Sequence, residues 1–265
     1  MKIYILVDME GGSGIHSFNL QTKRDSYYYK VAKRFVTQDT NAAIEGAFTA
    51  GADEVVVWDS HGSGTIDFEL LDPRAKLIRG VGAYSPWGMD SSFDALFQVA
   101  QHSKARTRKG VLCHTYSSRD IIGMWLNGKE IGEIGIRAAI AGTFDIPFVL
   151  ETGDEAACRE ARELVSEIET ACVKWGYAQE AALMLHPKKS YILIKEKATR
   201  AIKRVGEISP LKFGSPYELK VRYVQEQKAF LASSRTGVER VDSQTIVIRG
   251  DNIPELENSF WVESS

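Results

Sequence analysis

The sequence predicts an α/β fold, with a mostly parallel sheet covered by helices and a smaller C-terminal α+β portion. Over the first 150 residues, short apolar runs typical of strands alternate with longer segments typical of helices, which is the order expected of a parallel sheet. The runs are apolar throughout, as in strands that are buried on both faces. We therefore expect a main α/β domain at residues 1–189 and a smaller portion at 190–265, with a soft boundary between them.

The first three elements are the clearest. The run KIYILV at residues 2–7 predicts a strand that ends at Asp8. Residues 36–50 carry apolar side chains near helical spacing, and Gly51 follows them in a position typical of helix termination. The run EVVVW at 54–58 predicts a second buried strand.

The rest of the main domain is interpreted in the same way. Asn127 and Gly128 form the dipeptide most typical of a two-residue hairpin turn, and strand-like residues 124–126 and 129–131 flank it. The remaining expected elements are strands at 75–78, 95–100 (which also fits a buried helix), 110–113 and 147–150, and helices at 133–144 and 155–170.

The pattern changes in the C-terminal portion. Residues 190–203 predict a helix, because apolar side chains recur along most of their length. Residues 218–224, ELKVRYV, alternate between polar and apolar side chains, as in a strand with one solvated face, and residues 245–248 resemble them.

Composition excludes several classes of protein. The 33 basic and 35 acidic residues give a net charge of −2, whereas a nucleic-acid-binding protein normally has a basic excess. No apolar run approaches the roughly 20 residues that cross a bilayer, and the apolar core near the amino terminus is too short for a signal peptide. The odd number of cysteines, without a CxxC pair, favours a reducing compartment. We expect a cytoplasmic protein with no nucleic-acid or membrane partner.

Histidines and carboxylates follow four of the predicted strands. Asp8 and Glu10 follow the first strand, and His61, His102 and His114 end the runs EVVVWDSH, ALFQVAQH and GVLCH. The carboxyl ends of parallel strands meet at one edge of the sheet, where open α/β sheets bind ligands. We therefore expect these side chains to converge.

The chemistry of this set favours a metal centre. Asp8 and Glu10 are two residues apart, so in an extended segment both can face one cation. Imidazole nitrogen and carboxylate oxygen bind Zn²⁺ at about 2.0–2.2 Å, and such mixed sets are typical of catalytic sites. A pair of metals needs a bridging carboxylate and several terminal ligands, which this set can supply. Asp59, two residues before His61, is expected to orient that imidazole.

Other interpretations exist for each part of the set. An acidic residue after a strand is commonly a helix cap, and His61 or His102 alone also fits a hydrogen-bonded surface residue. GGSG at 11–14 could cradle a phosphate, although it lacks the Lys-Ser/Thr of a P-loop, or it could let the backbone pass close to a crowded site. Cys113 beside His114 is not a catalytic dyad, because adjacent strand residues face opposite sides.

Several motifs resemble one known family. VDMEG at 7–11, DSH at 59–61 and GEIG at 132–135, together with His102 and His114, resemble the D-aminopeptidases. These are cytoplasmic zinc peptidases that remove N-terminal D-amino acids from short peptides. The similarity runs over the first 154 residues and continues more weakly into the C-terminal portion.

The resemblance carries specific implications. It implies two zinc ions per subunit, with Asp8 as the bridging carboxylate and with the ligands Asp8, Glu10, His61, His102 and Glu133. It also implies a catalytic role for His114. Glu133 comes from the resemblance alone, since its own position fits an acidic residue stabilised by a helix dipole. The family further implies a homodecamer of two stacked pentameric rings.

The function expected from these observations is a metal-dependent aminopeptidase that hydrolyses short peptides, through a hydroxide that two zinc ions activate. One alternative keeps the binuclear centre but changes the substrate to another small amide, such as a lactam. A second alternative is a non-enzymatic α/β module that binds a small ligand through GGSG and the strand ends.

Overall fold

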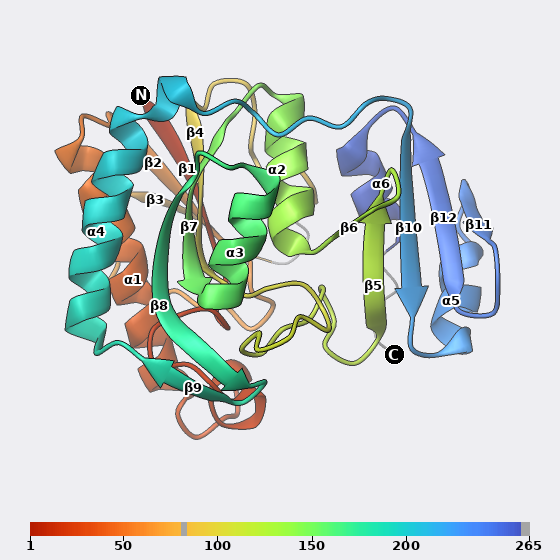
Figure 1. Ribbon diagram of the computed structural model, residues 1–265, viewed down its shortest axis with the longest axis horizontal. Coiled ribbons are helices and arrows are strands. Elements are labelled where there is room, and N and C mark those ends of the chain that lie inside the picture. The colour runs from red at the N-terminus through yellow and green to blue at the C-terminus, as the bar shows by residue number, and fades with distance from the viewer. Residues whose placement is uncertain (81–83, 261–265) are drawn as a thin grey trace.

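The computed structural model describes residues 1–80 and 84–260, and it confirms an α/β fold built on two sheets (Figure 1). The larger sheet is parallel except for its last pair. Its seven strands lie in the order β3 (Lys76–Ile78), β2 (Glu54–Asp59), β1 (Lys2–Val7), β4 (Ala95–Gln101), β7 (Phe148–Asp154), β8 (Glu169–Ala178) and β9 (Ala181–Met184).

The smaller sheet is antiparallel. Asn127 and Gly128 join two of its strands with φ values of 49° and 79°, as the predicted hairpin turn requires. Its five strands lie in the order β11 (Val238–Arg240), β12 (Thr245–Gly250), β10 (Tyr217–Tyr223), β5 (Ile121–Leu126) and β6 (Lys129–Ile131).

The helices form layers on both sheets. Helices α1 (Tyr29–Thr49) and α4 (Pro187–Lys203) pack together on one face of the larger sheet, and α3 (Glu155–Leu164) packs on the other. Helix α2 (Glu133–Thr143) lies between the two sheets (Figure 1). The shorter helices lie against the smaller sheet and are α5 (Glu226–Ser233) and α6 (Ile253–Ser259).

The division at residue 190 stays a proposal, and two features cross it. Strands β5 and β6 precede residue 190 but pair in the smaller sheet, and α4 packs against α1 of the main layer. The two portions therefore share a sheet and a helical layer.

The burial of the core strands explains why the sequence pattern predicted them. Ile3, Tyr4, Ile5, Leu6 and Val7 are all fully buried, as expected of a strand in the middle of a parallel sheet that is covered on both faces. The segment expected as a strand or a buried helix is strand β4, which pairs with β1 and β7 and is likewise buried over its whole length. Continuous apolar runs therefore mark the centre of the parallel sheet.

Several expected elements differ from the structure, and the helix expected at 36–50 already begins at Tyr29. No strand forms at 110–113: Leu112 has a positive φ of 52°, its amide donates to Gln179 O, and the amide of Val111 donates to Asp154 Oδ2. This apolar run is a buried loop held by those contacts. The helix expected at 155–170 ends at Leu164, since Val165 is extended and Glu169 already begins β8.

The strand order identifies a position for a site. The chain runs outward from β1 through β2 to β3 in one direction, and from β4 through β7 to β8 in the other. Loops diverge at such a switch point and leave a crevice at the carboxyl ends of the two central strands. Within the described residues, no helix is both long and apolar enough to span a membrane.

Candidate metal centre

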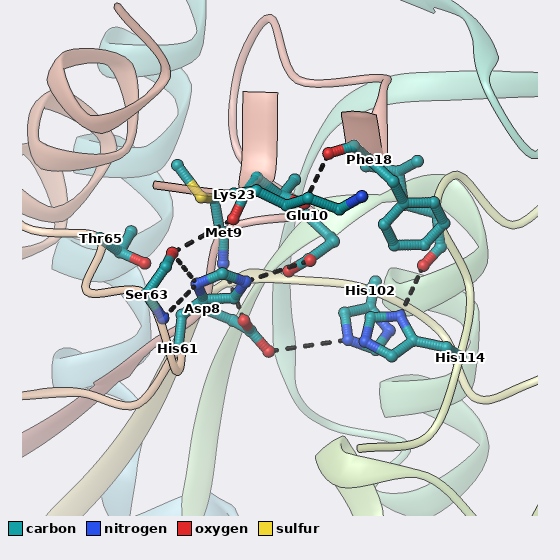
Figure 2. A network of polar contacts seen from close by, with 12 residues as sticks. Asp8, Met9, Glu10, Phe18, Lys23, His61, Ser63, Thr65, His102 and His114 are labelled. Carbon is teal, nitrogen blue, oxygen red and sulfur yellow. Dashed lines mark hydrogen bonds and ion pairs between the residues drawn. The ribbon is translucent and has the colours of Figure 1, made fainter. Parts of the chain in front are cut away.

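The side chains predicted from the strand ends do converge at this switch point. Asp8 and Glu10 directly follow β1, His61 follows β2, and His102 follows β4. Figure 2 shows them facing one another across the crevice. Asp8, Glu10 and His102 are almost fully buried, at 4%, 3% and 1% exposure, so their charges lie in a medium of low polarity.

One group of donors lies at the end of β1 and β2. Asp8, Glu10 and His61 each offer a ligand atom, and these atoms lie within 4.8 Å of one another. His61 Nε2 is 3.2 Å from Glu10 Oε1. Two oxygens and one nitrogen in this arrangement are suited to one zinc ion.

A second group lies at the end of β4. His102, His114 and Glu133 also offer atoms within 4.8 Å of one another. His102 Nε2 is 3.3 Å from Glu133 Oε1 and 3.7 Å from Asp8 Oδ2, so Asp8 lies between the two groups. This is the position that a bridging carboxylate would occupy.

Electrostatics in the centre reflect an excess of carboxylates. Burial raises the pKa of Asp8 to about 6, and the charges of Glu10 and Glu133 add to the effect. Burial alone would lower the pKa of His61, but the charge of Glu10 and its hydrogen bond raise it to about 9. The pKa of His102 is raised to about 10 against burial, mainly by Glu133. The protonated imidazoles of His61 and His102 thus offset the negative charge of the carboxylates. Bound metal cations could offset the same charge.

The residues fit a metal by a second criterion. Glu10 Oε2 is buried without a hydrogen-bond partner among the described residues, and the buried His102 Nε2 has only the ion-pair contacts to Glu133 and Asp8 described above. Buried polar atoms without partners are rare and require an explanation such as an ion. A cation at each group would supply the missing contacts.

His114 reaches the centre from a loop rather than from a strand end. Its Nδ1 lies 2.8 Å from Leu112 O, so this nitrogen carries the proton and donates it to the carbonyl. Burial lowers the pKa of His114, and the charge of His102 lowers it further. The ring is therefore neutral, with Nε2 as an acceptor. Phe18 contacts the ring edge-on, with centroids 5.6 Å apart (Figure 2).

Asp59 does not orient His61 as expected. Its carboxylate accepts hydrogen bonds from the amides of Thr65 and Ile66 and pairs with Arg79 at 2.7 Å. Ser63 takes the expected place, with its Oγ 2.8 Å from His61 Nδ1. The turn after His61 brings Ser63 back onto the ring, a local geometry that sequence spacing did not reveal.

The sequence analysis also did not assign Arg137 to the centre. It is buried on α2, with Nη2 2.9 Å from Glu133 Oε2 and Nη1 3.6 Å from Asp8 Oδ2. An arginine four residues after Glu133, within the apolar run of the helix, was the available signal. Its charge helps hold the pKa of Glu133 below the ordinary value, against the effect of burial.

Two cavities flank the centre. One, of about 560 Å³, includes Glu10 and Phe18 in its lining; the other, of about 690 Å³, includes Asp8 and Glu133. His61, His114 and Tyr116 line both. Several of the donors are therefore accessible to a small molecule from two sides.

Comparisons with known proteins agree on one family. Residues 1–262 match the sequence profile of the D-aminopeptidase family. The chain is 32% identical over 271 residues to a D-aminopeptidase of Bacillus subtilis (strain 168), covering 99% of this chain and 96% of that one. It also matches the solved structure of the zinc-dependent D-aminopeptidase DppA from Bacillus subtilis, described as a self-compartmentalizing protease. That match has a TM-score of 0.93, 28% identity and full coverage of both chains.

Proposed function

Because the chain belongs to the D-aminopeptidase family, we propose that it is a zinc-dependent aminopeptidase that removes N-terminal D-amino acids from short peptides. We assign two zinc ions per subunit to the two groups of donors. The proposed ligands are Asp8, Glu10, His61, His102 and Glu133. The observation that carries the proposal is the position of Asp8 between two groups of nitrogen and oxygen donors.

Zinc, when bound, supplies Lewis acidity, which polarises a scissile carbonyl and lowers the pKa of water to about 7. The chain supplies the remaining functions. His114 Nε2, the unprotonated nitrogen of a neutral ring, accepts the proton of the attacking water and returns it to the departing amine. Its Nδ1 stays bound to Leu112 O, which fixes the ring during the transfer.

His114 has a competing role as a ligand. Its ring lies within the donor group of His102 and Glu133, so proximity alone permits coordination. The catalytic assignment is supported by the position of the ring, which stacks on His102 and lines both cavities. The number of zinc ions bound by a His114 variant separates the two roles.

We also propose that the chain acts as a homo-oligomer, specifically a decamer, in the cytoplasm. The solved relative is described as self-compartmentalizing. Large apolar side chains are exposed on the β8–β9 hairpin and on α4, where a second copy could cover them: Tyr177, Leu183 and Ile192. The three cysteines are free, as in a reducing compartment. Light scattering of the purified protein measures the number of subunits.

The test of the function combines elemental analysis with a substrate screen. Purified protein should contain two zinc ions per subunit and should hydrolyse D-aminoacyl dipeptides. L-aminoacyl dipeptides and simple amides, including a lactam, are assayed in parallel. Equal rates on D- and L-peptides would contradict the stereospecific proposal, and hydrolysis of amides alone would favour the amidohydrolase alternative.

A further inference from the structure

Lys174, on β8, is a fully buried lysine that the sequence did not connect with any site. Its ammonium donates to three backbone carbonyls, those of Glu10, Gly12 and Ile15, at 2.5, 3.0 and 2.6 Å. These contacts use all three of its donors. A buried cation is costly unless it is compensated, so this arrangement requires the three carbonyls to stay in place.

A bulge in β8 directs this side chain inward. Gly153 pairs with Cys172, but the next residue, Asp154, pairs with Lys174, so Val173 is an extra residue on β8. Val173 and Lys174 are consecutive and both buried, which a regular strand facing two environments would not produce. Bulges of this kind re-aim a side chain and are frequent next to active sites.

Helix α1 also holds this loop. Asp39 is buried and accepts hydrogen bonds from Ser13 N at 2.8 Å and Ser13 Oγ at 2.9 Å. Gly11 lies against β4, where a Cβ would come within 1.8 Å of Gln101 O. The loop that follows the first two proposed ligands is thus fixed by three elements.

These contacts also explain the GGSG motif. The amides of Gly11, Gly12 and Ser13 donate to Ala100 O, Met9 O and the Asp39 carboxylate. They are therefore not free to cradle a phosphate, and the phosphate-loop interpretation is wrong. It is the carbonyls of the loop that converge, and they converge on a lysine.

We propose that Lys174 is a positioning residue for the metal centre, because it anchors the Glu10 carbonyl and the two carbonyls that follow it in the loop. The backbone of Glu10 sets the direction of its carboxylate, whose Oε1 lies 3.2 Å from His61 Nε2. The inference rests on the proposed function, since it assigns Glu10 as a zinc ligand.

The geometry makes this effect specific to one ion. Glu10 belongs to the donor group with Asp8 and His61, whereas the other group consists of His102, His114 and Glu133. Members of the second group follow β4, begin α2 or lie on the 110–116 loop, and none belongs to the 10–15 loop. Loosening the loop should therefore weaken the binding of the zinc ion that Glu10 holds more than the binding of the other ion.

The experiment compares Lys174→Gln with wild type in metal-free protein. Zinc is titrated in competition with a chromogenic chelator, and deuterium exchange is followed at the amides of residues 11–15. We expect one of the two zinc-binding steps to weaken by about 10- to 100-fold, the usual effect of losing a group that orients a ligand. The amides should also exchange faster in the variant.

Glu169→Gln is the matched control. Glu169 lies on the same strand and pairs with Lys197, Arg200 and Arg204 of the α4 segment, away from the loop. It should lower the free energy of unfolding without changing either zinc-binding step. Equal weakening in both variants would attribute the effect to general destabilisation and overturn the inference.

The remaining outcomes are also decisive. Two zinc-binding steps of wild-type affinity in Lys174→Gln would overturn the inference while leaving the proposed function intact. Fewer than two zinc ions in wild type would instead contradict the binuclear proposal itself. Should Lys174→Gln fail to fold, Asp39→Ala releases the same loop from the α1 side and must weaken the same step; unchanged zinc affinity in that variant would overturn the inference.

Discussion

The imidazole rings of His102 and His114 lie face to face, with centroids 3.9 Å apart and planes inclined by 13°. Positive charge on one ring disfavours it on the other, which contributes to the lowered pKa of His114 beside a His102 whose pKa is raised. A cation bound by His102 would have the same sign of effect. The stack therefore keeps His114 neutral and able to accept a proton.

Replacing His114 by alanine tests this role. We expect turnover of a D-aminoacyl dipeptide to fall by at least 100-fold, the lower range for loss of a general acid–base group. About two zinc ions should remain bound, the number that a two-metal centre requires. His186→Ala is the control, since His186 caps α4 and belongs to neither donor group. Loss of one zinc ion from His114→Ala would make His114 a ligand and reject the catalytic assignment.

Ser63→Ala tests what orients His61. Removing the hydroxyl 2.8 Å from His61 Nδ1 frees the ring to rotate, so zinc affinity should fall by about 10- to 100-fold. Asp59→Asn is the counterpart and should lower the free energy of unfolding more than the zinc affinity, because Asp59 holds Arg79 and the amides of the following turn. The opposite ranking in chelator titrations would restore Asp59 as the orienting residue.

Arg137→Gln tests the contribution of the Arg137 guanidinium, which lies beside both groups of donors. Metal-free protein should lose about 3–5 kcal/mol of unfolding free energy, because Glu133 and Asp8 are left as buried carboxylates without their arginine. Zinc should restore more stability to the variant than to wild type, since it compensates the same charges. Urea denaturation with and without zinc measures both quantities, and an equal loss in both conditions would contradict this account.

Glu151→Gln tests a buried carboxyl in β7. Burial raises the pKa of Glu151 well above its ordinary value, and Glu160 and Asp154 add to the effect. The folded state then holds a proton that the unfolded state releases above about pH 4.5. The free energy of unfolding of wild type should therefore fall as the pH rises above that value.

Glutamine has no proton to lose, so the variant should gain stability relative to wild type between pH 5 and pH 8. Among the described residues, neither oxygen of Glu151 has a hydrogen-bond partner, so the substitution removes no such contact. Denaturant unfolding at several pH values measures the difference. A constant difference across that range would show that Glu151 does not titrate there.

Sequence reasoning located the part of the centre that depends on buried strands. Asp8, Glu10, His61 and His102 each follow a run whose side chains are buried on both faces, so hydrophobicity alone revealed where the strands end. Their meeting then follows from parallel pairing. Their roles as ligands stay predictions that the experiments above test.

Site residues whose position depends on packing between elements could not be predicted in this way. His114 was expected at a strand end but lies on a loop, where the positive φ of Leu112 interrupts the apolar run. Glu133 reaches the centre because α2 packs between the sheets, and only family resemblance indicated it. Lys174 points inward because of a bulge in β8, and the hydrophobic periodicity of the sequence does not predict that bulge.

Helix α2 has one further consequence. Ile131 ends β6 in the smaller sheet and Glu133 begins α2, so Gly132 alone separates that sheet from a proposed ligand. The connection is also tightly packed, because a Cβ on Gly132 would come within 2.6 Å of Lys104 Cβ. A change in hairpin register would have to be absorbed in one residue or would displace Glu133. Substitutions in the antiparallel sheet that shift this hairpin should therefore change the spacing between the two donor groups.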